Sequence, residues 1–545
     1  MHARLTRICR LWMLLLLSYA VVGWCRLAMA QDDDLFSASP TEPAATSDAA
    51  AGAEQPQQPQ QLTEEDVRRL LQEGEAAVKA KDWQKALDSY NPLVRIFKQN
   101  LQAAPFLPLV HWGRGMGYAG LDDPESALAD FNEALKEDPK HLPTLLARGN
   151  LYLENNAAEL ALADFQLALE QERQNPEVLF GLGKAYVLLG GAQQAIKPLS
   201  YVIAQNDQNA EAYRLRAQAY AGVGKDAEAQ KDIDRALDLA PDDYESYLAL
   251  ATIYLREEKY PESVQALDDA IKHYKPKDPE STEPFSQGYL TKAAVLVEMG
   301  KKATDEAERK KAYEAALADC DALLELIGDS PVYTSVRAAT EYRRGTCLRM
   351  LGDYGEAINA FTEAINANPE LSEAYFRRGI CFYKIDENHM ALSDFQRAAN
   401  LAYTDPRPLL WEGFTYSQMG DYHEAIRAYG LALALSDRYV PAYINRGLAY
   451  MMLGENEKAI KDFHQAIRLE PTEWTHYFKR GVAYEQMGDY RRAANSYANA
   501  VRFDGEYVPA YRRAANAFAR IGENDRAAEY RAKAAELEAA QRSQQ

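Results

Sequence analysis

The chain is 545 residues long, 47% hydrophobic and 26% charged, with 61 Lys and Arg against 81 Asp and Glu and a formal net charge of −20. This acidic balance argues against a nucleic-acid-binding protein, which needs a basic stripe to neutralise phosphates. The length by itself suggests three or four ordinary domains. That expectation does not apply if the chain repeats one short unit many times.

Residues 1–30 are predicted to be a signal peptide. The first ten residues carry three arginines and no acid, Leu11–Trp24 is apolar, and Ala28–Ala30 has the small-residue pattern of a cleavage site. The apolar stretch is shorter than the about 20 residues that a membrane-spanning helix needs. We therefore expect cleavage after Ala30, export to the periplasm or the cell exterior, and no stable membrane span afterwards. An uncleaved signal that anchors the chain is the alternative.

Residues 31–62 are rich in Ala, Gln, Pro, Ser and Asp and have no apolar periodicity. Such a composition cannot bury enough apolar surface to offset the entropy lost on folding. We expect a disordered linker.

A 34-residue period begins near Thr63. The stretches LGDYGEAINAFTEAI, MGDYHEAIRAYGLAL and MGDYRRAANSYANAV start at Leu351, Met419 and Met487, which are 68 residues apart. A turn residue of the unit also recurs halfway between these stretches, so the period is 34 residues. Small residues recur every 34 residues at two positions of the unit, numbered 8 and 20 here. Position 8 holds Gly115, Gly149, Gly183, Ala217 and Ala251, and then Gly345, Gly379, Gly413, Gly447, Gly481 and Ala515; position 20 holds Ala127, Ala161, Ala195, Ala229 and Ser263, and then Ala357, Ala391, Ala425, Ala459, Ala493 and Ala527.

Residues 67–541 resemble the tetratricopeptide repeat (TPR) family, whose unit is two antiparallel helices in 34 residues. The resemblance implies an all-α fold, a right-handed superhelical solenoid of about 13 helix-turn-helix repeats. It also implies that the first helix of each repeat, helix A, lines a concave groove that holds peptide segments. The two known TPR recognition patterns, a Lys/Asn clamp and an asparagine ladder, are not reproduced in this sequence.

Departures from the period divide the array. We expect an N-terminal array of about six repeats over 63–273, a linker with an irregular repeat over 274–337, a C-terminal array of six repeats over 338–541, and a tail over 542–545. The irregular repeat contains the extra residues KKATDEAERKK, which are expected to lengthen its second helix, helix B, or the turn before it. The polar end of the last repeat suits a terminal cap.

No motif in the sequence predicts catalysis, a cofactor or a metal. The G-x-G-x-x-G at Gly115–Gly120 falls in register inside a predicted helix A, whereas a dinucleotide site needs it between a strand and a helix. The histidines are scattered, and no cysteine pair has zinc spacing. We expect a non-enzymatic protein without cofactor, an undetected enzyme being the alternative. Cys320, Cys347 and Cys381 are expected to be buried free thiols.

Charged residues pair up within repeats. Six repeats have Asp at position 23, and each of them also has a cation at position 7: Arg114 with Asp130, Arg148 with Asp164, Arg216 with Asp232, Lys292 with Asp319, Arg378 with Asp394 and Arg446 with Asp462. We interpret this as a partly buried ion pair between helices A and B that fixes their register more than it adds stability. Ordinary helix-surface charge is the alternative.

The expected peptide-binding residues lie in the last six repeats. Position 6 holds Arg343, Arg377, Trp411, Asn445, Lys479 and Arg513 there, position 5 adds Tyr342, Phe376 and Phe478, and position 9 adds Phe414. The seven earlier repeats have no cation at position 6. Charge is uneven as well: residues from 338 onward hold 26 basic and 28 acidic residues, so most of the negative charge lies before them.

These residues predict a scaffold that binds protein or peptide segments with acidic residues. Arginine suits bidentate binding of carboxylates, and the aromatic residues would hold apolar side chains. Two alternatives remain at this stage. The first is a cell-envelope or periplasmic factor that binds glycan or assists assembly, and the second is that position 6 is only a solvated helix face.

Overall fold

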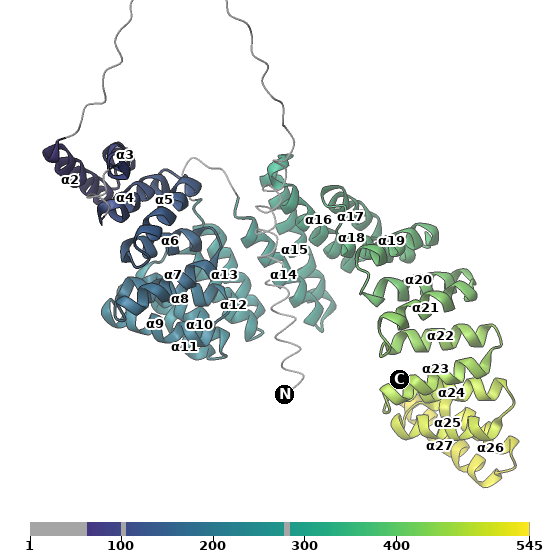
Figure 1. The fold of residues 1–545 in the computed structure, drawn as a ribbon. Coiled ribbons are helices and arrows are strands. Elements are labelled where there is room, and N and C mark those ends of the chain that lie inside the picture. Colours follow the sequence, from purple (N-terminus) through teal and green to yellow (C-terminus); the bar gives the residue numbers. More distant parts are fainter. Residues whose placement is uncertain (1–62, 100–104, 277–283, 544–545) are drawn as a thin grey trace, which may run out of the picture. The chain divides into compact units, whose positions relative to one another are not determined.

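The computed structural model describes residues 63–99, 105–276 and 284–543 (Figure 1). The predicted signal peptide and the predicted linker over 31–62 lie outside these ranges. Within them the regular secondary structure is entirely helical, and the predicted all-α class of consecutive helix pairs is confirmed. No helix in these ranges combines the length and the apolar character that crossing a membrane requires.

The chain forms two compact units, one ending at Val295 and the other beginning at Leu296. The division lies inside α14 (Ser286–Lys302). The first unit contains α2 (Glu64–Ala80), α3 (Trp83–Gln99), α4 (Leu107–Gly120), α5 (Pro124–Glu137), α6 (Leu142–Glu154), α7 (Ala158–Gln171), α8 (Pro176–Leu188), α9 (Ala192–Gln205), α10 (Ala210–Gly222), α11 (Asp226–Leu239), α12 (Tyr244–Arg256) and α13 (Tyr260–His273).

The second unit continues in the same way after α14. It contains α15 (Glu306–Ile327), the short 3₁₀ helix η3 (Pro331–Tyr333), α16 (Thr334–Leu351), α17 (Tyr354–Ala367), α18 (Ser372–Lys384), α19 (Asn388–Leu401), α20 (Pro406–Met419), α21 (Tyr422–Leu435), α22 (Val440–Met452), α23 (Asn456–Leu469), α24 (Trp474–Gln486), α25 (Tyr490–Phe503), α26 (Val508–Arg520) and α27 (Asn524–Ser543). Even-numbered helices are helix A of a repeat and odd-numbered helices are helix B.

Local signals start and stop these helices. The hydroxyl of Thr63 accepts a hydrogen bond from the backbone N–H of Asp66, whose carboxylate bonds back to the N–H of Thr63, a capping box that starts α2. The turn from helix A to helix B passes through the left-handed region, with φ of 85° at Gly420. Asp386 occupies the same position in the preceding repeat with φ of 62°, although residues with a Cβ avoid this region.

The two helices of a repeat pack through a glycine and a ring. An ideal Cβ placed on Gly447 of α22 would lie 2.7 Å from Cε1 of Phe463 on α23, and a Cβ on Gly413 would lie 2.4 Å from Cε1 of Tyr429. Real Cβ atoms do not come this close, so the ring at position 24 requires glycine at position 8. Where position 8 is Ala251, position 24 is the smaller Leu267.

Five of the six predicted ion pairs are present. In each, Nε and Nη2 of the arginine donate to the two carboxylate oxygens of the aspartate, and the shortest donor–acceptor distances are 2.6 to 2.8 Å; the pairs are Arg114–Asp130, Arg148–Asp164, Arg216–Asp232, Arg378–Asp394 and Arg446–Asp462. The aspartates are buried. The sixth predicted pair, Lys292 with Asp319, joins residues of different units and stays a prediction.

The same arginines also bond to the preceding repeat. Nη1 of Arg148 donates to Oδ1 of Asn132 at 2.6 Å, and Nη1 of Arg378 donates to the hydroxyl of Thr362 at 2.9 Å. Both acceptors stand at position 25 of the helix B before. The ion pair therefore connects three helices, and one of these bonds crosses the boundary between repeats.

The irregular repeat is longer than its neighbours, as predicted. Helix α15 has 22 residues, whereas the regular B helices have 14, and it starts at Glu306 after the N-cap Asp305. The extra residues thus extend the end of α14 and the start of α15. At the other end, α27 runs to Ser543, two residues beyond the expected end of the array at 541, and Arg531 is exposed on it.

Candidate functional site

The predicted binding residues come together in pairs from neighbouring repeats of the second unit. A residue at position 5 of one helix A lies against position 6 of the next helix A. The guanidinium of Arg377 reaches the hydroxyl of Tyr342, Trp411 packs on the apolar cluster that contains Phe376, and the guanidinium carbon of Arg513 lies 5.8 Å from the ring centre of Phe478. One such pair lies between α16 and α18, one between α18 and α20, and one between α24 and α26.

The aromatic residues of this surface are largely engaged with one another. Phe376 is only 3% exposed and belongs to the core between α18 and α19. The half-buried Trp411 has Tyr383, Phe395 and Phe414 around it, with ring centres 5.5, 6.1 and 5.6 Å away. Little of Phe376 is therefore offered to a ligand, and the aromatic residues mainly support the polar side chains beside them.

The four cations at position 6 have different surroundings. Arg377 forms an ion pair with Glu373 on its own helix at 2.6 Å, and Arg513 pairs with Glu485 of the preceding repeat at 2.8 Å. Arg343 and Lys479 have no carboxylate within ion-pairing distance among the described residues. Burial lowers the pKa of both side chains. Two of the four cations at position 6 are thus paired with a carboxylate, and the other two are not.

Asn445 satisfies part of its hydrogen bonding within its own helix. Its side-chain amide donates to the carbonyl oxygen of Pro441 at 2.6 Å. Position 6 therefore holds no cation between Trp411 and Lys479, and Asn445 offers a ligand only its remaining polar groups.

Sequence reasoning missed Arg349. This residue stands at repeat position 12, in α16, seven residues after Tyr342. Residues seven apart in a helix lie on nearly the same face. Burial and the neighbouring Arg377 lower the pKa of Arg349. Helical spacing could have found it, but its proximity to Arg377 depends on how α16 packs against α18.

The buried thiols are confirmed. Cys320, Cys347 and Cys381 are free and at most 2% exposed. Burial raises the pKa of Cys347 and of Cys381 to about 12. Cys320 and Cys347 lie close to Arg343, which counts among the charges that act on both.

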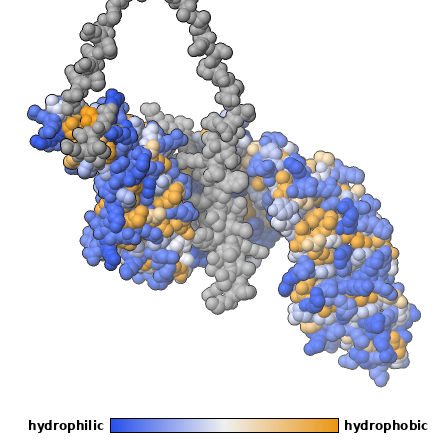
Figure 2. Space-filling view, in the orientation of Figure 1, coloured by the Kyte–Doolittle hydropathy of each residue, from blue (hydrophilic) through white to orange (hydrophobic). Residues whose placement is uncertain are grey.

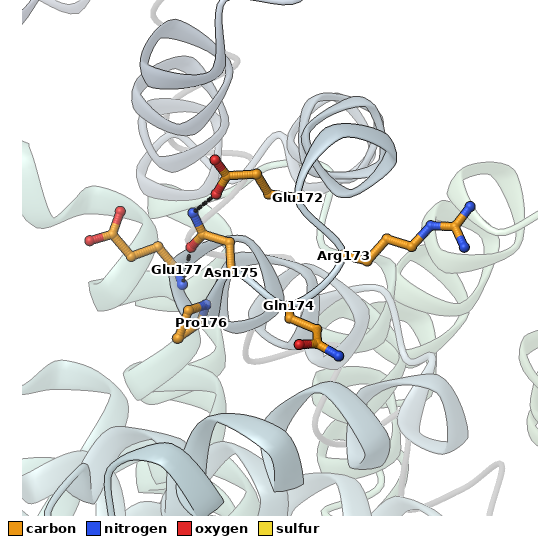
Figure 3. Close-up of a pocket in the computed structure, with 6 residues that line it drawn as sticks. All are labelled: Glu172, Arg173, Gln174, Asn175, Pro176 and Glu177. Carbon is orange, nitrogen blue, oxygen red and sulfur yellow. Dashed lines mark hydrogen bonds between the residues drawn. The ribbon is translucent and has the colours of Figure 1, made fainter.

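A surface depression in the first unit contains no comparable chemistry (Figure 3). It is lined by six consecutive residues, Glu172–Glu177, which form the turn after α7 and the first two residues of α8. The amide of Asn175 donates to Glu172 at 2.7 Å and its oxygen accepts from the backbone N–H of Glu177 at 2.9 Å. This is the N-cap of α8. Among the described residues, no group of three or more His, Cys, Asp or Glu side chains could hold a metal ion.

Family comparisons agree with the repeat geometry. Four models described as tetratricopeptide repeat match the chain, at residues 113–177 and 214–281, at 338–371, at 407–439 and 477–507, and at 440–473. The chain is a multi-repeat TPR protein. Proteins of this family generally bind other proteins, so the TPR array supports a protein-interaction scaffold, and the family is generally non-enzymatic.

Several solved structures are similar to parts of this TPR chain. MamA is 25% identical over 31% of this chain and 93% of its own, with a TM-score of 0.30. Cut9, from the APC/C hetero-tetramer Cut9-Hcn1, is 14% identical over 86% of this chain and 93% of its own, with a TM-score of 0.36. Yeast Tom70 is 14% identical over 88% and 96%, with a TM-score of 0.34. No curated protein sequence matches the chain.

Proposed function

We propose that this TPR chain is an exported, non-enzymatic scaffold whose second unit binds protein or peptide segments along its helix A surface. The observation that carries the proposal is the row of cations at position 6, where Arg343 and Lys479 have no internal carboxylate partner in the described part of the chain. A row of partly desolvated cations favours a partner with acidic residues. The first unit has no cation at these positions.

Charge reversal tests the proposal once a partner has been co-purified with the full chain. The double variant Arg377→Glu, Lys479→Glu should weaken partner binding by tenfold or more, which corresponds to about 1.4 kcal/mol. Binding should also depend less on salt, because exposed charge attraction is screened. Arg427→Glu, on helix B α21 with a side chain 57% exposed, is the control for charge reversal outside the helix A surface. Unchanged binding by the double variant would place the partner elsewhere.

A glycan partner is the alternative that the same experiment separates. Glycan binding through aromatic residues needs ring faces open to the ligand, whereas Trp411 is surrounded by three other rings and Phe376 is buried. These contacts favour a polypeptide. Retention of the wild-type chain on cell-wall polysaccharide, with the double variant retained equally, would support the glycan instead.

Export is proposed from the order of charged, apolar and small residues in positions 1–30. Edman sequencing of the protein from its native host should begin at Gln31. Recovery of Met1, or a chain that stays in the membrane fraction after alkaline washing, would support the alternative, an uncleaved signal that anchors the chain.

A further inference from the structure

A cluster of arginines near the start of the second unit has fewer neighbouring carboxylates than guanidinium groups. It consists of Arg343 and Arg349 on α16, Arg377 on α18, and the hydroxyl of Tyr342; we refer to it as the arginine site. The described residues place no carboxylate within ion-pairing distance of Arg349. Its Nη2 lies 3.2 Å from Sδ of Met350, a weak acceptor, and its buried Nε has no acceptor.

The second guanidinium of the site shares its anion. Arg377 pairs with Glu373 at 2.6 Å, but the same carboxylate also pairs with Arg407 at 2.9 Å, and Arg407 pairs in addition with Asp405 at 2.7 Å. Nε of Arg377 is buried without an acceptor. With Arg349 included, three cations stand against two anions here.

Arg343 adds a further positive charge beside them. Its buried Nε has no acceptor, and the groups that interact with it electrostatically are Cys320, Tyr342 and Cys347, none of them a carboxylate. The next residue shows what an ordinary arrangement looks like, since Nε of Arg344 donates to Asp321 at 2.8 Å. The three arginines of the site and Arg407, set against Glu373 and Asp405, therefore carry a net charge of +2.

A buried charge without a partner is costly. Burial disfavours the charge on Arg349 by removing water, and the neighbouring guanidinium of Arg377 disfavours it further. An oxyanion between the two would satisfy both, because a planar guanidinium binds a carboxylate or phosphate through two parallel N–H donors. The side chain of Arg377 is 27% exposed, so solvent reaches part of it.

We propose that the arginine site binds an oxyanion, between Arg349 and Arg377, and that this anion is a side-chain carboxylate of the polypeptide that the scaffold holds. This inference rests on the proposed function and names the group that anchors the partner. The site already holds one side-chain carboxylate, since Glu373 pairs with Arg377 at 2.6 Å, and this favours a second carboxylate from a bound polypeptide over free phosphate.

The test uses the full chain and a fluorescent capped peptide with two glutamates, its glutamine counterpart, and inorganic phosphate as competitor. The glutamate peptide should bind, the glutamine peptide should not, and Arg349→Gln with Arg377→Gln should weaken binding at least tenfold. Arg427→Gln is the control for the loss of a surface cation away from the site. No binding of the glutamate peptide, or phosphate binding more tightly than the peptide, would overturn the proposal.

The stability of the free protein separates a binding role from a structural one. Arg349→Gln removes an uncompensated charge, so the melting temperature of the free chain should rise while the stabilisation by the glutamate peptide is lost. A lower melting temperature would show that Arg349 supports the fold instead. If the double variant binds the native partner as tightly as the wild type does, the arginine site does not anchor the partner, but the proposed scaffold function is unaffected. If the wild-type chain binds no protein partner, the proposed scaffold function is refuted.

Discussion

At the scale of single residues, the position 7 arginines show how a repeat fixes its register. Nε and Nη2 of Arg446 hold both oxygens of Asp462 at 2.8 and 2.7 Å, and the carboxylate is only 7% exposed. The pKa of Asp394 shows the cost of such burial, because desolvation raises it despite the hydrogen bonds from Arg378. At Asp130 desolvation also acts to raise the pKa, but hydrogen bonds from His111 and Arg114 outweigh it and the pKa is lowered.

Arg446→Met should therefore destabilise the chain by on the order of 3 kcal/mol, because Asp462 is left buried without its partner. The change is measured as the shift of the denaturant midpoint of the second unit. Adding Asp462→Leu should recover much of the loss, since two apolar side chains need no pairing.

Arg427→Met is the control for this pair. Arg427 and Glu424 lie 2.7 Å apart, but their side chains are 57% and 49% exposed, so the loss should stay under about 1 kcal/mol. A midpoint for Arg446→Met no different from that of the control would refute the importance of burial.

The three thiols give a second prediction, on pH. A thiolate is the form that reacts with iodoacetamide, and burial raises the pKa of Cys347 and Cys381 to about 12. Native protein at pH 8 should leave both thiols, and that of Cys320, unmodified, whereas guanidinium-unfolded protein should label all three. Peptide mass spectrometry reads each site separately. Fast labelling of the native protein would contradict their burial.

At the scale of helices, the glycine and the ring of a repeat depend on each other. Gly447→Ala should cost roughly 1–3 kcal/mol, because Phe463 is fully buried and has no space to give way. In the background Phe463→Leu, the same substitution should cost much less, since the chain itself combines Ala251 with Leu267. Denaturant midpoints of the four proteins give the coupling directly.

Gly355→Ala is the matched control for this cycle. Gly355 lies in α17 with nothing within 4 Å of an added Cβ, so alanine there should stabilise by up to about 1 kcal/mol. Additive effects of Gly447→Ala and Phe463→Leu would show that the glycine is required for another reason.

The helix pairs could be predicted because their information is local. The spacing of Gly345, Gly379 and Gly413 already defines where each helix A crosses its helix B, and the Arg and Asp at positions 7 and 23 identify a contact inside one repeat. The candidate site needed the structure. Arg349 meets Arg377 only through the packing of α16 on α18, and no spacing rule reveals that Glu373 is shared between two arginines.

At the scale of the whole molecule, the array should respond to damage locally. Each helix in a stack of repeats contacts mainly its immediate neighbours. Gly447→Ala should therefore increase amide hydrogen exchange in α20–α25 while α4–α11 keep their wild-type rates, as read by mass spectrometry. Equal acceleration throughout the chain would show that the two units unfold as one.

The surface of both units is mixed. Figure 2 shows hydrophobic residues in separate groups among hydrophilic ones on the face in view. The most exposed large apolar side chains, Tyr403 at 77% and Val332 at 72%, stand in different segments of the second unit. Scattered apolar residues of this kind are normal for a folded surface, which leaves the charged residues of the helix A surface to distinguish the second unit.

The pairing of glycine with a ring has a consequence for how such a chain can be lengthened or shuffled. The glycine and the ring stand in the same 34-residue unit, so copying or deleting a whole unit keeps the two together. Exchanging a single helix between the repeat with Gly447 and Phe463 and the repeat with Ala251 and Leu267 would instead create a clash or a cavity. The bond from Arg378 to Thr362 crosses the joint between copies. Recombination that starts a cassette at helix A therefore keeps the contact between positions 8 and 24, whereas contacts across the joint, such as this bond and the close approach of Gly181 to the ring of Phe165, must be matched with the new neighbour.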